Sequence, residues 1–129
     1  MRRLRVFVVE DSEAVRSRLV AMLRELRGVE VAGEAASVAD AIARIPGRHP
    51  DAVLVDLRLP DGDGFDVIRA VKALTPAPAV MVLTNYAYPL LRARGLAAGA
   101  DWFLDKAAEF PRIPEILGEL RRVTGARTR

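Results

Sequence analysis

The sequence predicts a doubly wound α/β fold, in which five helices cover a five-stranded parallel sheet. Five short apolar runs alternate along the chain with five segments of helical periodicity, which is the pattern of repeated βα units. The third and fourth runs read as continuously apolar, as is typical of strands that helices cover on both faces. With 129 residues, the chain has the length of about one domain.

Each expected strand is followed by one expected helix. The strands are expected at 4–9, 29–34, 52–56, 79–84 and 101–104. The helices are expected at about 13–26, 37–45, 64–74, 89–98 and 113–123. The first helix carries one apolar stripe, and we expect it to begin at Asp11 or Ser12 and to end at Gly28.

Turn-forming residues mark the ends of the middle helices. The second helix is expected to begin at Ser37 and to stop at the Pro-Gly pair 46–47. The third follows a turn at 60–63, and the fourth ends at Gly99. The stretch 61–64 superficially resembles a calcium loop, but it lacks the acidic spacing and the terminal glutamate of such loops.

Composition excludes several classes of site. The chain has no cysteine and a single histidine, His49, so any metal must be held by oxygen atoms. The net charge of +3 comes with basic residues clustered at the two ends and without interleaved aromatics, which favours solvated termini over a nucleic-acid surface. No apolar run is long enough to span a bilayer, and we expect a cytoplasmic protein that binds no membrane.

Acidic residues follow two of the expected strands. Right-handed crossovers bring the carboxyl ends of all the strands to one edge of the sheet, so Glu10, Asp11 and Asp56 should meet there. Three carboxylates require a cation, and Mg²⁺ prefers oxygen ligands. One carboxylate could then attack a phosphoryl donor, with Lys106 and Thr84 supplying a cation and a hydroxyl for the phosphoryl oxygens. Alternatively, Glu10 and Asp11 are only an acidic pair at a helix N-terminus.

Four segments in register resemble the receiver domain of bacterial two-component response regulators. They are VVED at 8–11, VDLRLPDGDGFD at 55–66, VLT at 82–84 and AAGADWFLDK at 97–106. The resemblance implies a stand-alone, chemotaxis-regulator-like receiver at 1–124 with a short tail at 125–129. It also implies the flavodoxin-like strand order 2-1-3-4-5.

The resemblance assigns a role to each site residue. Asp56 would be the phosphoacceptor, and Glu10 and Asp11 would form the acid pocket that holds Mg²⁺. The backbone carbonyl of Arg58 would complete the protein's share of the metal ligands. Lys106 and Thr84 would contact the phosphoryl group.

Thr84 and Phe103 would form the switch pair, in which Thr84 moves toward the phosphoryl group and the aromatic side chain turns inward behind it. Trp102, next to Phe103 in a strand, should then face away from the core, and we expect it near the site.

The resemblance also implies partners. A sensor histidine kinase or a histidine phosphotransfer protein would donate the phosphoryl group, and a protein partner would bind the face formed by helix four, strand five and helix five. A homodimer can form through the same face. The chain would not be an enzyme, apart from self-catalysed phosphoryl transfer and autodephosphorylation.

Four positions depart from or vary within the family pattern. Asn85 stands where a small residue usually follows the switch threonine, which puts access to the phosphoryl group in question. Arg58 and Tyr86 occupy positions that vary in the family and set the lifetime of the aspartyl phosphate. Ala107 replaces a common proline, so the peptide bond after Lys106 is expected to be trans.

Two other functions remain open at this point. A phosphatase of the haloacid-dehalogenase type also uses a strand-end aspartate, a threonine, a lysine and Mg²⁺, but it has its general acid at the position of Arg58 and a cap insertion that is missing here. A degenerate receiver, in which Asn85 or poor metal binding has removed the switch chemistry, would act only as a binding module.

Overall fold

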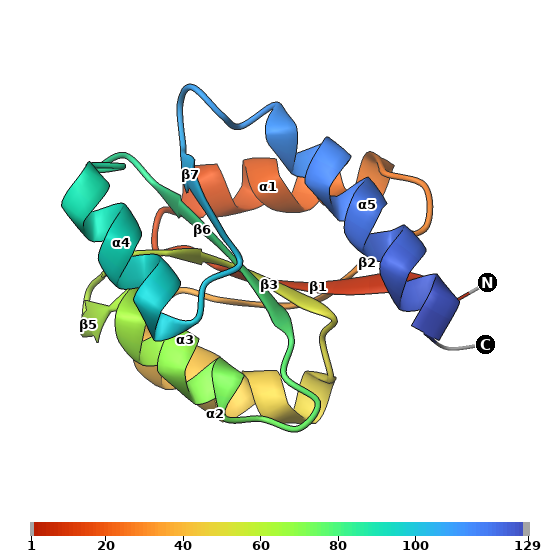
Figure 1. The fold of residues 1–129 in the computed structure, drawn as a ribbon, viewed down its shortest axis with the longest axis horizontal. Coiled ribbons are helices and arrows are strands. Elements are labelled where there is room, and N and C mark those ends of the chain that lie inside the picture. Colours follow the sequence, from red (N-terminus) through yellow and green to blue (C-terminus); the bar gives the residue numbers. More distant parts are fainter. Residues whose placement is uncertain (1, 128–129) are drawn as a thin grey trace.

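The computed structural model describes residues 2–127, with side chains as far as Thr124, and contains a five-stranded parallel sheet (Figure 1). Its strands are β1 (Leu4–Val9), β2 (Val29–Ala35), β3 (Ala52–Asp56), β6 (Ala79–Thr84) and β7 (Trp102–Asp105). They lie in the order β2-β1-β3-β6-β7. Since β6 and β7 are the fourth and fifth strands of this sheet along the chain, the expected order 2-1-3-4-5 is confirmed.

Five helices cover the two faces of the sheet. They are α1 (Glu13–Glu25), α2 (Val38–Arg48), α3 (Gly64–Lys72), α4 (Pro89–Ala98) and α5 (Arg112–Arg127). Helices α1 and α5 lie on one face, and α2, α3 and α4 lie on the other (Figure 1). None of the helices in the described part of the chain is both long and apolar enough to cross a membrane.

Alternate residues of each strand enter two separate cores. On β1, Phe7 and Val9 face the core under α2 and α3, whereas Val6 and Val8 face the core under α1 and α5. This period of two is the direct consequence of the β pleat, and helices on both faces explain why the central strands are apolar throughout. Strand β3 is buried along its entire length.

Most helix boundaries follow the expected signals. Ser12 caps α1 by accepting a hydrogen bond from the N–H of Val15 at 3.3 Å, and Ser37 caps α2 in the same way. Helix α1 ends at Leu26 rather than Gly28, which lies two residues later at φ 79°. Helix α4 spans 89–98 and ends at Gly99, as expected.

Helices α2 and α5 end later than expected, and α3 ends at Lys72 instead of 74. Helix α2 does not stop at Pro46 but continues to Arg48, and His49 ends it in a left-handed conformation. The proline removes only one backbone donor close to the last turn, and beyond it the Arg48 side chain donates to the Ala32 carbonyl of β2. Helix α5 extends to Arg127, so most of the segment expected as a tail is helical, and residues 128–129 lie outside the described part.

The turn at 60–63 forms a small antiparallel hairpin between β4 (Arg58–Leu59) and β5 (Gly62–Asp63). Asp61 accepts hydrogen bonds from the first two N–H groups of α2, at 2.7 and 3.0 Å, and these bonds hold the pKa of Asp61 below its ordinary value. Asp63 caps α3 through the N–H of Phe65. One turn therefore fixes the start of two helices.

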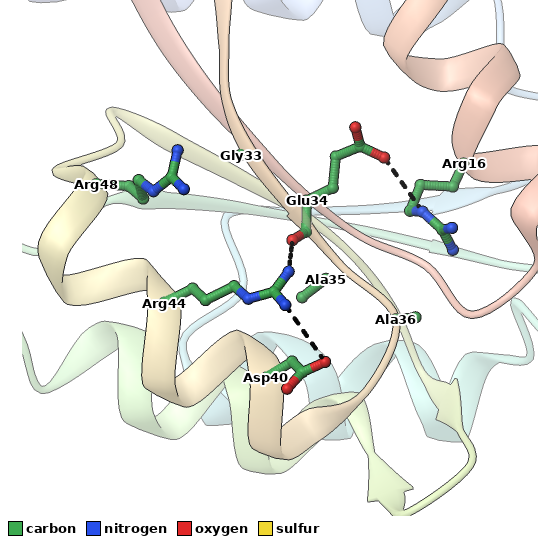
Figure 2. Close-up of a pocket in the computed structure, with 8 residues that line it drawn as sticks. All are labelled: Arg16, Gly33, Glu34, Ala35, Ala36, Asp40, Arg44 and Arg48. Atoms are coloured by element: carbon green, nitrogen blue, oxygen red, sulfur yellow. Dashed lines mark hydrogen bonds and ion pairs between the residues drawn. The ribbon is translucent and has the colours of Figure 1, made fainter.

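The edge strand β2 borders a polar cleft of about 510 Å³ (Figure 2). Arg44 and Arg48 of α2 donate to the carbonyls of Glu34 and Ala32, at 2.9 and 3.1 Å. Arg16 of α1 pairs with the Glu34 carboxylate at 3.2 Å. Arg44 and Arg48 occupy backbone carbonyls that an additional strand would need as acceptors, and they thereby protect the edge of the sheet.

Candidate functional site

The expected site residues meet at the carboxyl edge of the sheet. Asp56 ends β3, Thr84 ends β6, and Glu10, Asp11 and Lys106 directly follow β1 and β7. Glu10, Asp56 and Thr84 are buried, whereas Asp11 is exposed. The parallel topology therefore places all five side chains at one edge, either on the last residue of a strand or on the loop that follows it.

Lys106 joins the two buried carboxylates. Its Nζ atom lies 2.7 Å from Glu10 Oε1 and 3.0 Å from Asp56 Oδ2, and the three side chains are only 13%, 2% and 11% exposed. Burial raises the pKa of Glu10, and the nearby Asp56 charge adds to this effect. Burial alone would lower the pKa of Lys106, but its hydrogen bonds to Glu10 and Asp56 outweigh burial and raise it.

Backbone groups hold the other carboxylate oxygens. Glu10 Oε2 accepts the N–H of Ser12 at 3.0 Å, and Asp56 Oδ1 accepts the N–H of Arg58 at 3.3 Å. Arg16 donates to the carbonyl of Glu10 at 2.9 Å. Each carboxylate is therefore oriented by the loop that carries it.

The acidic cluster has the chemistry of a divalent cation site. Glu10, Asp11 and Asp56 each offer a carboxylate oxygen, and these atoms all lie within 4.8 Å of one another. An all-oxygen donor set suits a hard cation such as Mg²⁺, which retains several waters. Because Lys106 contacts two of the three carboxylates, a bound cation would have to share or displace this lysine.

Thr84 and Phe103, the expected switch pair, are both buried. Thr84 is buried, its Oγ1 accepts the N–H of Tyr86 at 3.1 Å, and its carbonyl accepts the N–H of Lys106 at 2.8 Å. Phe103 is 2% exposed and already faces the core under α4 in the unmodified chain. A phenylalanine has no hydroxyl that would offset exposure of its ring to water, which favours this inward position.

Trp102 does not lie where we expected it. It packs against the core under α1 and α5, because helices cover both faces of the sheet. It pairs with Met81 at the start of β7, whereas Asp105 pairs with Thr84 at the end near the site. The tryptophan is therefore at the opposite end of the strand from the acidic cluster.

Arg58, Asn85 and Tyr86, three of the four positions that depart from or vary within the family pattern, border the site. The Arg58 guanidinium lies over the Tyr86 ring, 4.2 Å from its centroid. Both residues, together with Thr84, line a pocket of about 300 Å³. Asn85 is exposed. Arg58 and Tyr86 thus form a stacked pair close to Asp56, a contact that their separation in the sequence did not suggest.

Several residues that support the site were not predicted from the sequence. Gly64 passes so close to β3 that a Cβ atom would lie 2.5 Å from the Asp56 carbonyl oxygen. The carboxylates of Asp105 and Glu109 bind backbone N–H groups on either side of Lys106. A glycine at a helix start and acidic residues near a turn are the only local signals of these roles.

Comparison with known proteins identifies the family. Residues 6–118 match the family model of the response regulator receiver domain. The chain belongs to this family. Receiver domains are the phosphorylation-based signalling switches of two-component systems, and the five-stranded α/β architecture described above is that of this family.

Relatives from several bacteria support the assignment. The chain is 38% identical to the DNA-binding transcriptional activator DevR/DosR of Mycobacterium tuberculosis over 80% of the chain and 48% of that protein. It is 37% identical to a protein-glutamate methylesterase/protein-glutamine glutaminase of Anaeromyxobacter dehalogenans over 99% of the chain and 36% of that protein. The chain thus spans half or less of these curated relatives.

A solved structure resembles almost the entire chain. The signal receiver domain of the putative response regulator NarL from M. tuberculosis superposes with a TM-score of 0.86 at 29% identity, over 95% of this chain and 98% of that one. The match confirms the five-stranded α/β receiver architecture.

Proposed function

We propose that the chain accepts a phosphoryl group on Asp56, with Mg²⁺ held by Glu10, Asp11, Asp56 and the backbone carbonyl of Arg58. The observation that carries this proposal is the ion-paired cluster at the sheet edge, where Lys106 Nζ lies within 3.0 Å of both Asp56 and Glu10. A sensor histidine kinase or a histidine phosphotransfer protein is the proposed donor.

Each side chain of the site has a different role in the proposed phosphoryl transfer. A carboxylate oxygen of Asp56 attacks phosphorus, so that an O–P bond forms as the N–P bond of the donor phosphohistidine breaks. Mg²⁺, when bound, would neutralise the carboxylates and the phosphoryl oxygens. Lys106 leaves its carboxylate partners to pair with a phosphoryl oxygen, and the Thr84 hydroxyl donates to another.

The output of the switch is proposed to be a protein contact on the face of α4, β7 and α5. Helix α4 begins with Tyr88 and Leu90 exposed, at 61% and 74%, which offers apolar area to a protein partner or to a second copy of the chain. Modification of Asp56 would shift a two-state equilibrium of this face.

The receiver unit is proposed to comprise residues 1–124, to act in the cytoplasm and to bind no nucleic acid. The DNA-binding description belongs to a relative of which the chain covers 48%.

The phosphatase alternative is less favoured by the geometry. The position of its general acid is held by Arg58, whose guanidinium stacks on Tyr86 at 4.2 Å. The chain is accordingly proposed to have no activity on a separate substrate, apart from self-catalysed phosphoryl transfer and autodephosphorylation.

Magnesium binding separates a working receiver from a degenerate one. We expect Mg²⁺ at millimolar concentration to shift the amide resonances of Asp11 and Arg58, and beryllofluoride to shift Thr84 further in the presence of Mg²⁺. Asp56→Asn should lose the beryllofluoride response. A folded wild-type chain that responds to neither would be a binding module instead. Trp102 fluorescence is a poor reporter, because this residue lies at the far end of β7.

A further inference from the structure

In the turn that carries Lys106, every backbone N–H group donates a hydrogen bond. Asp105 Oδ1 accepts the N–H groups of Ala107 and Ala108, at 2.9 and 2.8 Å. The Asp105 carbonyl accepts the N–H of Glu109, and the Glu109 carboxylate in return accepts the N–H of Asp105, both at 2.9 Å. The N–H of Lys106 donates to Thr84, so five consecutive N–H groups from 105 to 109 are bonded.

Glu109 is the point at which this turn is attached to the helices. Its Oε2 accepts from Arg112 of α5 at 2.6 Å, and its Oε1 lies 3.7 Å from Arg92 of α4. The N–H of Asp105, followed by Arg112 and Arg92, lowers the pKa of Glu109 from its ordinary value. The carboxylate is therefore charged at neutral pH, which strengthens its bond to the Asp105 amide.

Arg92 continues the connection to the switch aromatic. It donates to the Phe103 carbonyl at 2.8 Å and lies 5.5 Å from the centroid of the Phe103 ring. Three residues later, α4 approaches the same ring so closely that a Cβ at Gly95 would lie 2.7 Å from it. The turn of Lys106, the switch aromatic and α4 are thus joined through Glu109 and Arg92.

We propose that Glu109 is a positioning residue for Lys106: it fixes the turn that aims the ammonium group at Asp56, and it connects that turn to α4 through Arg92. This inference rests on the proposed function of Asp56. Lysine has four rotatable side-chain bonds, so its aim depends on a fixed backbone origin. Glu109 itself does not touch the reacting groups.

Four variants separate geometry from charge. Glu109→Gln retains an oxygen that can accept the Asp105 N–H, Glu109→Asp retains the charge but loses reach, and Glu109→Ala loses both. Glu119→Ala is the matched control, because Glu119 is an exposed acid on α5, the helix that follows this turn, and its side chain makes no hydrogen bond or ion pair among the described residues. The probe is phosphoramidate with Mg²⁺, and the readouts are the rate of Asp56 phosphorylation and the proton shift of the Asp105 amide.

We expect Glu109→Ala and Glu109→Asp to slow phosphorylation about tenfold, since small misplacements of a catalytic group are costly. Both should also move the Asp105 amide proton upfield, as expected for a lost charge-assisted bond. Glu109→Gln should stay within about twofold of the wild-type rate, and Glu119→Ala should be unchanged. If Glu109→Ala does not fold, the rate and the amide shift of Glu109→Asp test the inference in its place. A full rate in Glu109→Asp with a slow Glu109→Gln would overturn the inference, because charge would then matter and position would not.

Amide exchange tests the connection to α4. Arg92→Gln and Glu109→Ala should each speed exchange in α4, and the double variant should be no faster than the faster single one, because both break one connection. If the increases in exchange rate of the two single variants add in the double variant, the proposed connection through Glu109 and Arg92 is overturned. If the wild type is not phosphorylated at all, the proposed function fails. The positioning inference can still be tested, because Glu109→Asp should then change the NMR shifts of the Asp105 amide and the Lys106 ammonium group. Unchanged shifts would overturn the inference.

Discussion

Replacing Lys106 with methionine would test the ion-paired cluster most severely. Methionine has a similar length and no charge, so Lys106→Met leaves Glu10 and Asp56 facing each other without a cation. Glu10 is 2% exposed and cannot gain much hydration without local opening. We therefore expect the chain to lose stability at neutral pH.

The distances set the size of the effect. Each contact, at 2.7 and 3.0 Å, represents an attraction of roughly 6 kcal/mol at an effective dielectric constant of about 20. Dehydration of the three charged groups offsets much of this, and breaking comparable buried pairs costs about 3–5 kcal/mol. Asp56 and Lys106 retain some contact with water, so we expect a loss of about 3 kcal/mol, at the lower end of that range.

Urea unfolding followed by circular dichroism measures this loss, with EDTA at pH 7. The gap to wild type should narrow as the pH falls through the raised pKa of Glu10, because protonation removes the repulsion between the carboxylates. Mg²⁺ should stabilise the variant more than the wild type, since no lysine competes for the oxygens. Lys72→Met, which breaks the exposed pair with Asp101, should cost about 1 kcal/mol or less. A loss equal to this control would refute the reasoning.

Three further substitutions test local contributions to the stability of the fold and of the site. Gly64→Ala should cost about 1–3 kcal/mol and slow phosphorylation of Asp56, because the new methyl group meets backbone atoms that cannot yield; normal values for both would contradict this. Gly47→Ala, in open space within α2, should instead stabilise the chain by about 0.5–1 kcal/mol. Asp61→Asn should lower the urea midpoint at pH 7, and the difference should shrink below pH 3.8 and vanish as the pH falls through the lowered pKa of the wild-type carboxylate. A difference that persists in acid would show that charge is irrelevant there.

The strands and the edge at which the site lies could be predicted because their signals are strong. Continuous apolar runs mark β3 and β6, and the right-handed crossover rule brings their carboxyl ends together. Asp56 and Thr84 therefore had to be neighbours of the acidic pair after β1. The family resemblance added the roles of these residues, which neither periodicity nor spacing could supply.

Interactions between distant side chains could not be predicted in the same way. Helix α2 continues past Pro46 to Arg48, whose side chain donates to the Ala32 carbonyl of β2, a contact that the local stop signal does not reveal. The pairing of Lys106 with both carboxylates, and the attachment of its turn to Glu109, depend on contacts between loops whose conformations the sequence pattern does not determine. Trp102 was placed wrongly because adjacent strand residues here enter two different cores.

The mass of the intact chain after incubation with phosphoramidate and Mg²⁺ tests the central claim most directly. We expect the wild type to gain the mass of one phosphoryl group, and Asp56→Asn to gain none while remaining folded. EDTA should prevent the gain in the wild type. An unlabelled wild type, or equal labelling of Asp56→Asn, would contradict the assignment of Asp56 as the phosphoacceptor.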